Sequence, residues 1–276
     1  MKVVSTIQEL ERERKMLSSP VGFVPTMGFL HEGHLSLVRG AGKESKSVVV
    51  SIFVNPTQFG PEEDLASYPR DVERDLKLLE NEGVNLVFTP SAEEIYPPGY
   101  CTWVEVEGIT HILEGASRQG HFRGVATVVL KLLNIVQPDR TYFGQKDAQQ
   151  AVVIQRMVSD LNLDTEIVVL PTLREPDGLA MSSRNIYLSP PERKVALCIF
   201  DSLRLARELY QGGERSTEII CHKMTDLMLS QPQVKLDYVG IVHPQTLKKM
   251  VEVKPGALVL VAAWVGKVRL IDNILI

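Results

Sequence analysis

Short β-rich runs alternate with helix-like runs through the first two-thirds of this chain. Expected strands lie at Val21–Val24, Ser47–Val54, Asn85–Phe88, Arg140–Phe143 and Thr165–Leu170, and expected helices at Thr6–Leu17 (capped by Ser5), Gly33–Gly42, Asp71–Glu82, Phe122–Val136 and Asp147–Leu161. This alternation predicts βαβ units and a parallel sheet, an α/β fold of Rossmann-like type. Ligands of such sheets bind at the carboxyl ends of the strands, so the loops that follow the strands are the first places to search for a site.

The pattern changes after about residue 176. Pro190 and Pro191 open a long helix that runs to about Tyr210, and a second helix is expected over Ser216–Leu229. The strand-like runs that follow lie at Lys235–Val242, Ala257–Ala263 and Lys267–Ile274. We therefore expect a Rossmann-like domain at 1–176 and a smaller α+β lid domain with an antiparallel sheet at 177–276.

Composition excludes several classes of protein. The chain has 276 residues, is 44% hydrophobic and carries a formal net charge of −4, which argues against a protein that coats nucleic acid. No run approaches the roughly 18 apolar residues of a membrane span, and no signal peptide is expected. The three widely spaced cysteines suit a reducing, cytoplasmic environment.

The segment from Phe23 to His34 contains the most informative turn of the sequence. A strand ends, a loop containing Gly28 turns, and a helix begins at or near His31. His31 and His34 share one helix face, where free backbone N–H groups and the helix dipole favour an anion. Imidazole N–H donors there suit phosphate oxygens, and Gly33 leaves room for a nucleotide close to the backbone.

Two other interpretations of this turn exist. A zinc site is disfavoured because His31 and His34 lack the i, i+4 spacing of a His-Glu-x-x-His helix, and no cysteine cluster lies nearby in the sequence. A pair of ordinary surface histidines at a helix start is the structural alternative.

Two further segments contain residue types that suit phosphate binding. Ser182, Ser183 and Arg184 offer two hydroxyls and a guanidinium to triphosphate oxygens, and Asp177-Gly178 supplies a flexible turn that lets their loop close. Lys146 follows a strand and supplies a point charge, with a solvated surface lysine as its alternative. Asp147 either caps the next helix or ligates Mg²⁺.

The histidine turn and the Met181–Arg184 segment together resemble the His-Ile-Gly-His and Lys-Met-Ser-Lys-Ser signatures of class I synthetases and nucleotidyltransferases. Five segments resemble one family of that superfamily, pantothenate synthetase or pantoate–β-alanine ligase. They are Pro25–His34, Ser51–Gly60, Gly120–Val129, Phe143–Gln150 and Met181–Asn185. They occur in order and span about Val24 to Leu188. Gln119 stands where the family is expected to have proline.

The resemblance implies roles residue by residue. The implied catalytic residues are His34, His31, Lys146 and Arg184. The implied ATP-binding residues are Met27, Gly28, Phe29, Leu30, His31, Glu32, Gly33, His34, Gly144, Gln145, Lys146, Asp147, Met181, Ser182, Ser183 and Arg184. Gln58 and Gln150 are implied to hold pantoate, Gln58 also to meet β-alanine, Asn55 to shape that pocket, and Asp147 to bind Mg²⁺. Val125 and Val129 either receive pantoate methyl groups or pack in the core, and the roles of His121 and Arg123 stay open.

The family's reaction implies small-molecule partners: pantoate, β-alanine and ATP, with Mg²⁺ as cofactor and a homodimer as assembly. ATP adenylates the pantoate carboxylate and releases pyrophosphate; the amine of β-alanine then displaces AMP. Another nucleotidyltransferase would need basic residues in place of Gln58 and Gln150 to hold a phosphate substrate. An aminoacyl-tRNA synthetase would need a basic surface for tRNA. A non-catalytic nucleotide-binding regulator would bind ATP without turnover.

Overall fold

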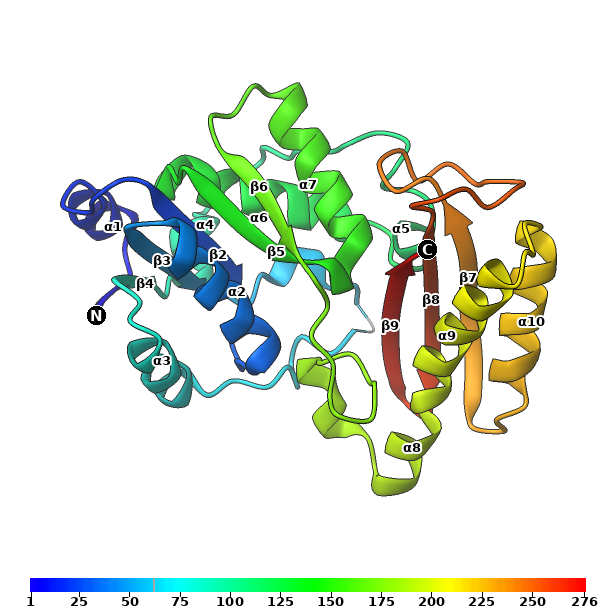
Figure 1. Cartoon of the computed structure of the whole chain (residues 1–276). Helices are drawn as coiled ribbons and strands as arrows, with labels where there is room; N and C mark the ends of the chain where they lie inside the picture. Colours follow the sequence, from blue (N-terminus) through cyan, green and yellow to red (C-terminus); the bar gives the residue numbers. More distant parts are fainter. Residues whose placement is uncertain (62) are drawn as a thin grey trace. The chain divides into compact units, whose positions relative to one another are not determined.

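Six parallel strands form the sheet of the first unit in the computed structural model, which describes residues 1–61 and 63–276 (Figure 1). Their order is β1-β4-β3-β2-β5-β6. The strands are β1 (Lys2–Val4), β2 (Val21–Thr26), β3 (Ser47–Ile52), β4 (Leu86–Phe88), β5 (Arg140–Gly144) and β6 (Glu166–Leu170). The expected α/β, Rossmann-like class is confirmed. Strand β1 was missed because its three residues are too few to show an alternating pattern.

Both faces of this sheet are buried, which explains the continuous apolar runs of β2 and β3. Successive strand residues point to opposite faces. Phe23 and Val49 pack in one core with α1 (Ile7–Arg14) and α6 (His121–Val136), whereas Val24 and Val50 pack in another with α2 (Glu32–Glu44) and α3 (Val72–Asn81). The shorter helices of this unit are η1 (Pro56–Gln58), α4 (Ala92–Ile95) and α5 (Glu114–Ser117).

The second unit contains, within the described residues, a three-stranded antiparallel sheet in the order β7-β8-β9. Its strands are β7 (Val234–Val242), β8 (Leu258–Val265) and β9 (Val268–Leu275). Its helices are η2 (Gln145–Asp147), η3 (Ser183–Tyr187), α8 (Pro190–Val195), α9 (Leu197–Gln211) and α10 (Thr217–Leu229). Helices α9 and α10 pack against this sheet (Figure 1), so the expected α+β character is confirmed.

Two local expectations need correction. Thr6 rather than Ser5 caps α1, because only Thr6 lies three residues before Glu9 and so completes a capping box with it. The single long helix expected from Pro190 to about Tyr210 is two helices, α8 and α9, which meet at Ala196.

The compact units differ from the expected domains 1–176 and 177–276 at two points. The first unit comprises Met1–Gly144 and Val153–Pro171, and the second comprises Gln145–Val152 and Thr172–Ile276. The boundary thus falls inside α7 (Ala148–Asp160). Gln145 and Lys146 group with the second unit because their carbonyls accept hydrogen bonds from Asn273 of β9.

Candidate active site

The histidine turn leaves β2 through a backbone conformation that requires glycine. Gly28 has φ +81°, and a Cβ there would come within 2.9 Å of Ile52 Cγ2. Phe29, which follows, also has a positive φ of 49°. An L-residue in this region is strained, so the surrounding structure must hold the turn in place.

Asp75 of α3 supplies that restraint. The N–H groups of Phe29 and Leu30 donate to its carboxylate at 2.6 and 2.8 Å, and the side chain is fully buried with 0% exposed. Burial raises the pKa of Asp75, and the two backbone hydrogen bonds oppose that rise. Arg74 beside it donates to the Leu30 carbonyl at 2.9 Å and lies over the Phe29 ring.

Sequence reasoning missed Asp75, although one signal was present. Asp75 and Leu79 are four residues apart and therefore share the buried face of α3. A carboxylate on an apolar helix face marks a buried polar contact.

His31 caps α2, and its ring lies against that of His34, with centroids 4.0 Å apart. His31 Nδ1 accepts from the Gly33 N–H at 3.1 Å, and His34 Nδ1 accepts from the His31 N–H at 3.3 Å. A ring nitrogen that accepts carries no proton, so in the neutral rings the proton is on Nε2. Both imidazoles are thereby fixed as Nε2–H donors.

The expectation of free backbone N–H groups at this helix start is contradicted for Gly33 and His34. The N–H groups of Phe29 and Leu30 bond to Asp75, and those of His31, Gly33 and His34 bond to His31 or His34. An anion here would meet imidazole Nε2–H groups rather than an open row of amides. The side chain of Glu32 pairs with Arg39 at 2.9 Å and that of Leu30 is buried, and the contact of either residue with ATP stays a prediction.

Gln58 and Asn55 form a buried amide pair beside this turn. Asn55 Nδ2 donates to Gln58 Oε1 at 3.1 Å, and Gln58 Nε2 donates to Met27 Sδ at 3.0 Å. Tyr96 donates to Asn55 Oδ1 at 2.9 Å, which fixes the orientation of the Asn55 amide. Since Gln58 Oε1 is occupied by Asn55, the group that Gln58 offers a ligand is its Nε2 donor.

The side chain of His121 contacts the backbone of Gln58. Its Nδ1 lies 2.8 Å from the Gln58 carbonyl, which only accepts, so Nδ1 donates and Nε2 accepts from Arg118 at 3.0 Å. Glu63 in turn accepts two hydrogen bonds from Arg118, each of 2.7 Å. Burial, followed by the Arg118 charge, lowers the pKa of His121 to about 4, so the ring is neutral near pH 7. These contacts agree with the structural alternative for His121.

The other open residues of α6 also have defined surroundings. Val125 and Val129 are 2% and 4% exposed and belong to the apolar core, in agreement with the packing alternative. The Arg123 guanidinium lies 4.7 Å from the centre of the Trp103 ring. Gly124 lets α6 approach η1 closely, because a Cβ there would come within 2.4 Å of the Thr57 carbonyl.

The second unit carries the lysine and serine–arginine segments. Lys146 Nζ lies 3.3 Å from Asp147 Oδ1 in η2, and both side chains are partly exposed. The side chain of Gln145 is directed to β9, because its amide donates to Asn273 Oδ1 at 2.9 Å. Any contact of Gln145 with ATP therefore falls to its backbone. Gln150 is half-buried on the first turn of α7.

Ser182 caps η3, since its hydroxyl accepts from the Arg184 N–H at 3.3 Å, and Ser183 is buried. The turn before them is held rather than free. Arg174 donates to the Gly178 carbonyl at 3.1 Å, Arg193 pairs with Asp177 at 2.8 Å, and a Cβ on Gly178 would clash with the Phe200 ring. The flexibility expected of the Asp177-Gly178 turn stays a prediction beside these contacts.

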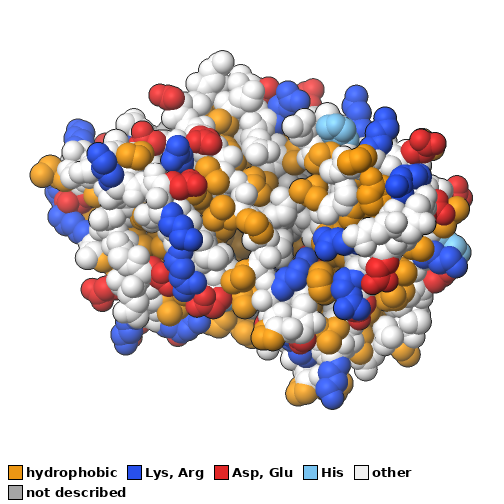
Figure 2. Space-filling model, viewed as in Figure 1, with side chains coloured by type: hydrophobic (Ala, Val, Ile, Leu, Met, Phe, Trp, Pro, Cys, Tyr) orange, Lys and Arg blue, Asp and Glu red, His pale blue; other side chains and the backbone are white. Residues whose placement is uncertain are grey.

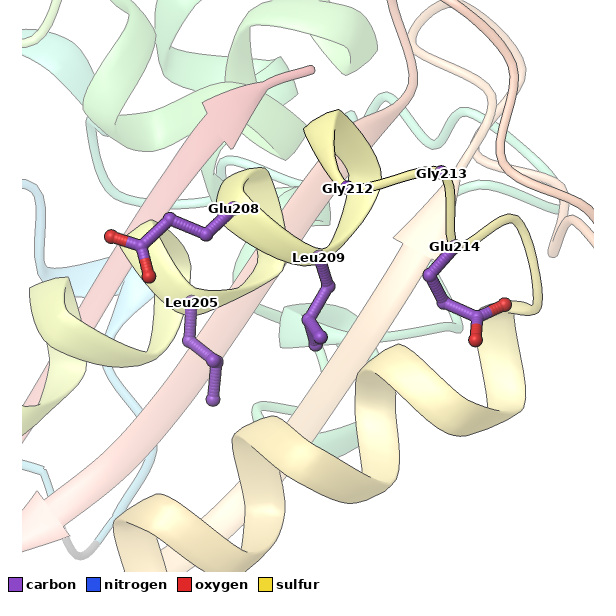
Figure 3. A pocket seen from close by; sticks show the side chains of 6 residues that line it. All are labelled: Leu205, Glu208, Leu209, Gly212, Gly213 and Glu214. Carbon is purple, nitrogen blue, oxygen red and sulfur yellow. The ribbon is translucent and has the colours of Figure 1, made fainter.

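A shallow depression of about 540 Å³ lies at the end of α9, away from these residues in the sequence. Figure 3 shows Leu205 and Leu209 leaving α9 on one side and Glu208 on another. Its remaining lining residues are Gly212, Gly213 and Glu214. These lining residues include no cation to hold a phosphate, so we do not place a substrate there.

Three further properties of residues 1–61 and 63–276 bear on a candidate site: surface charge, groups of metal ligands and membrane-crossing helices. On the face in Figure 2, basic and acidic side chains are interspersed. In this part of the chain, no three His, Cys, Asp or Glu side chains gather as a metal ion would require. The helices found there are too short or too polar to cross a lipid bilayer.

Comparison with known proteins gives one consistent result. The model of the family described as "Pantoate-beta-alanine ligase" matches residues 2–275. "Pantothenate synthetase" of Thermotoga petrophila is 56% identical over 276 residues, covering 99% of each chain. The crystal structure of pantothenate synthetase from Thermus thermophilus has a TM-score of 0.95 at 50% identity and covers 99% of each chain. Pantoate-beta-alanine ligase from Francisella tularensis, "complexed with Beta-gamma ATP and Beta-alanine", has a TM-score of 0.83 at 38% identity and covers 100% of this chain and 97% of that one.

Proposed function

Because this chain belongs to the pantoate–β-alanine ligase family and is an enzyme of that kind, we propose that it condenses (R)-pantoate with β-alanine through a pantoyl adenylate. In the first step, a pantoate carboxylate oxygen attacks the α-phosphorus of ATP and pyrophosphate leaves. In the second, the β-alanine amine attacks the acyl carbon, AMP leaves with the bonding electrons, and the amine loses a proton. The products are pantothenate, AMP and pyrophosphate.

The observation that carries this proposal is the neutral amide beside the histidine turn. Gln58 is directed by Asn55 to present Nε2, and that nitrogen lies 3.0 Å from Met27 Sδ within the turn. An N–H donor suits the carboxylate and hydroxyl oxygens of pantoate, whereas a phosphate substrate would call for a cation. This favours a carboxylate-activating ligase over a nucleotidyltransferase that acts on a phosphate.

His34 and His31 act as the charge-stabilising donors of the first unit. Their Nε2–H groups suit the negative charge that grows on phosphate oxygens as pyrophosphate leaves. Donors fixed before the reaction need no reorganisation in the transition state, which is the main source of such catalysis. Met27 and Gly28 contact the nucleotide through the turn that Asp75 shapes.

In the second unit, Lys146 and Arg184 supply positive charge to the triphosphate, and the hydroxyls of Ser182 and Ser183 add donors. Gln150 serves pantoate as a second amide. Orienting the bound reactants accounts for roughly 7–11 kcal/mol of the barrier in well-aligned reactions, and water must be excluded because it would hydrolyse the adenylate.

Mg²⁺ is proposed as cofactor, with Asp147 as its protein ligand. The Asp147 side chain is 47% exposed and pairs only loosely with Lys146, so its carboxylate can reach a metal ion. Mg²⁺ commonly takes one carboxylate, several waters and substrate phosphates, which fits a single acidic residue. When bound, the ion would neutralise charge on the phosphate oxygens.

Three wider expectations accompany the proposal. The second unit acts as a lid, the enzyme is a homodimer, and it works in the cytoplasm. The first two rest on the family resemblance. Free Cys101, Cys198 and Cys221 support a reducing compartment.

Isotope exchange tests the proposal. With pantoate present and β-alanine absent, labelled pyrophosphate should pass into ATP, because adenylation is reversible on the enzyme. Exchange that needs a different acid would overturn pantoate as the substrate and leave the adenylation chemistry standing. ATP binding without exchange by any acid would support the non-catalytic regulator instead.

A further inference from the structure

Asp272 interrupts the apolar face of β9. Strand residues two apart share a face, and Val268, Leu270 and Ile274 all belong to the apolar core of the second unit. Asp272 occupies the same face and is only 3% exposed. A carboxylate at such a position destabilises the fold unless it is paired, so a specific contact must account for it.

That contact is Arg174. The guanidinium donates to both carboxylate oxygens of Asp272, at 2.5 and 3.0 Å, and stacks 4.0 Å from the centre of the Phe200 ring. Arg174 also donates to the Gly178 carbonyl at 3.1 Å. The buried ion pair thus fixes the turn that leads directly into Leu179–Arg184.

Asn273, the next residue, fixes the other phosphate-facing segment. Its Nδ2 donates to the carbonyls of Gln145 and Lys146, both at 2.9 Å, and its Oδ1 accepts from Gln145 Nε2 at 2.9 Å. Both amide hydrogens are therefore used on the backbone of one short segment. Asn273 is itself only 3% exposed.

We propose that Asp272 and Asn273 are positioning residues that hold Gln145–Asp147 and Leu179–Arg184 in the arrangement adenylation requires. The inference rests on the proposed function, since Lys146 and Arg184 are the cations assigned to the triphosphate. Two consecutive residues of one hydrogen-bonded strand fix both segments, so the distance between the two anchor points varies little. Two polar side chains that are each only 3% exposed are thereby given a purpose that packing alone does not supply.

A graded series at Asn273 tests the first anchor. Asn273→Ala removes all three hydrogen bonds, Asn273→Asp turns oxygen toward two carbonyl oxygens, and Asn273→Ser keeps one donor. We expect the kcat of pyrophosphate exchange to fall by about 10²-fold in the alanine and aspartate variants, with the KM for pantoate unchanged and partial recovery in the serine variant. A lower melting temperature with unchanged kcat, measured where the variant is folded, would overturn the proposal.

Asp272→Asn tests the second anchor against a matched control. Asp237→Asn makes the same change in an ion pair with Arg269 that also involves β9, and this pair lies outside both segments. We expect Asp272→Asn to speed amide hydrogen exchange across residues 173–184 and to lower kcat, and Asp237→Asn to do neither. Equal behaviour of the two variants contradicts the assignment. If neither Asn273→Ala nor Asp272→Asn folds, Gln145→Leu is used instead, because it removes the hydrogen bond from Gln145 to Asn273. An unchanged kcat of pyrophosphate exchange in that variant would also overturn the proposal.

Failure of the proposed function has a different signature. In that case the wild-type enzyme shows no pantoate-dependent exchange at all. Calorimetric titration with ATP then decides the positioning role: weaker ATP binding by Asn273→Ala than by Asp237→Asn supports it, and equal binding refutes it.

Discussion

Replacement of Asp75 should damage the histidine turn from a position outside the turn itself. The carboxylate is the acceptor for two successive backbone N–H groups, those of Phe29 and Leu30. Asp75→Ala removes the carboxylate acceptor of both donors, of which that of Leu30 is buried and that of Phe29 part-buried, and Asp75→Asn can satisfy one and turns an amide N–H₂ toward the other.

The magnitude follows from the number of orphaned donors. Each unsatisfied buried donor costs about 1–3 kcal/mol, so Asp75→Ala should lower the free energy of unfolding by about 2–6 kcal/mol and Asp75→Asn by about half of that. Phe29 is held at φ 49°, a strained conformation that costs on the order of 1–3 kcal/mol and relaxes once its restraint is lost. Relaxation would displace His31 and His34, so activity should fall further than stability alone predicts.

Urea denaturation and steady-state kinetics measure the two effects. Asp71→Ala is the matched control, because Asp71 caps the same helix by accepting from the Arg74 N–H at 3.1 Å but does not bond to the turn. Loss of that cap should cost about 1 kcal/mol and leave the kinetics unchanged. The reasoning is refuted if Asp75→Ala and Asp71→Ala lose equal stability, or if Asp75→Ala keeps its wild-type KM for ATP and its kcat while folded.

Three further changes have defined outcomes. His34→Ala should reduce kcat by about 10²–10³-fold with a smaller effect on ATP affinity; if only affinity falls, His34 is a binding contact. The pKa of His121 is about 4 in the folded protein and 6.5 ordinarily. Between pH 4 and pH 6.5 the unfolded chain therefore binds a proton at His121 that the folded protein does not. Its contribution to stability is complete above pH 6.5 and is lost as pH falls toward 4, by roughly 3 kcal/mol. Urea titrations at several pH values should show this slope in the wild type and not in His121→Gln, and equal slopes would contradict it. Gly28→Ala should destabilise by at least about 1–2 kcal/mol because of its φ of +81°, whereas Gly42→Ala, in open space on α2, should stabilise by up to about 1 kcal/mol. Calorimetric melting of the pair gives the sign of each effect, and a Gly28→Ala variant that melts no lower than the wild type would show that the turn tolerates a side chain.

Local patterns in the sequence were sufficient for most of the secondary structure. The apolar runs of β2 and β3 and the helix expected over Asp71–Glu82 each depend on local residues, and the structure confirms them, with the helix at Val72–Asn81. The start of α2 at His31 was likewise predicted from the order of strand, glycine loop and histidines. Periodicity succeeds here because its physical cause is local.

The residues that hold the candidate site in place make contacts between distant parts of the sequence. Asp75 holds a backbone N–H 46 positions away, His121 meets a carbonyl 63 positions away, and Asn273 binds one 128 positions away. No local pattern identifies which distant donor or acceptor a buried polar side chain will meet, because that depends on the path of the whole chain. The sequence by itself therefore determined most of the strands and helices and the residue types that suit ATP and a carboxylate. Only the tertiary structure decided the tautomers of His31 and His34, the orientation of Gln58 and the anchoring of Lys146, since each is set by hydrogen bonds that exist only once the chain has folded.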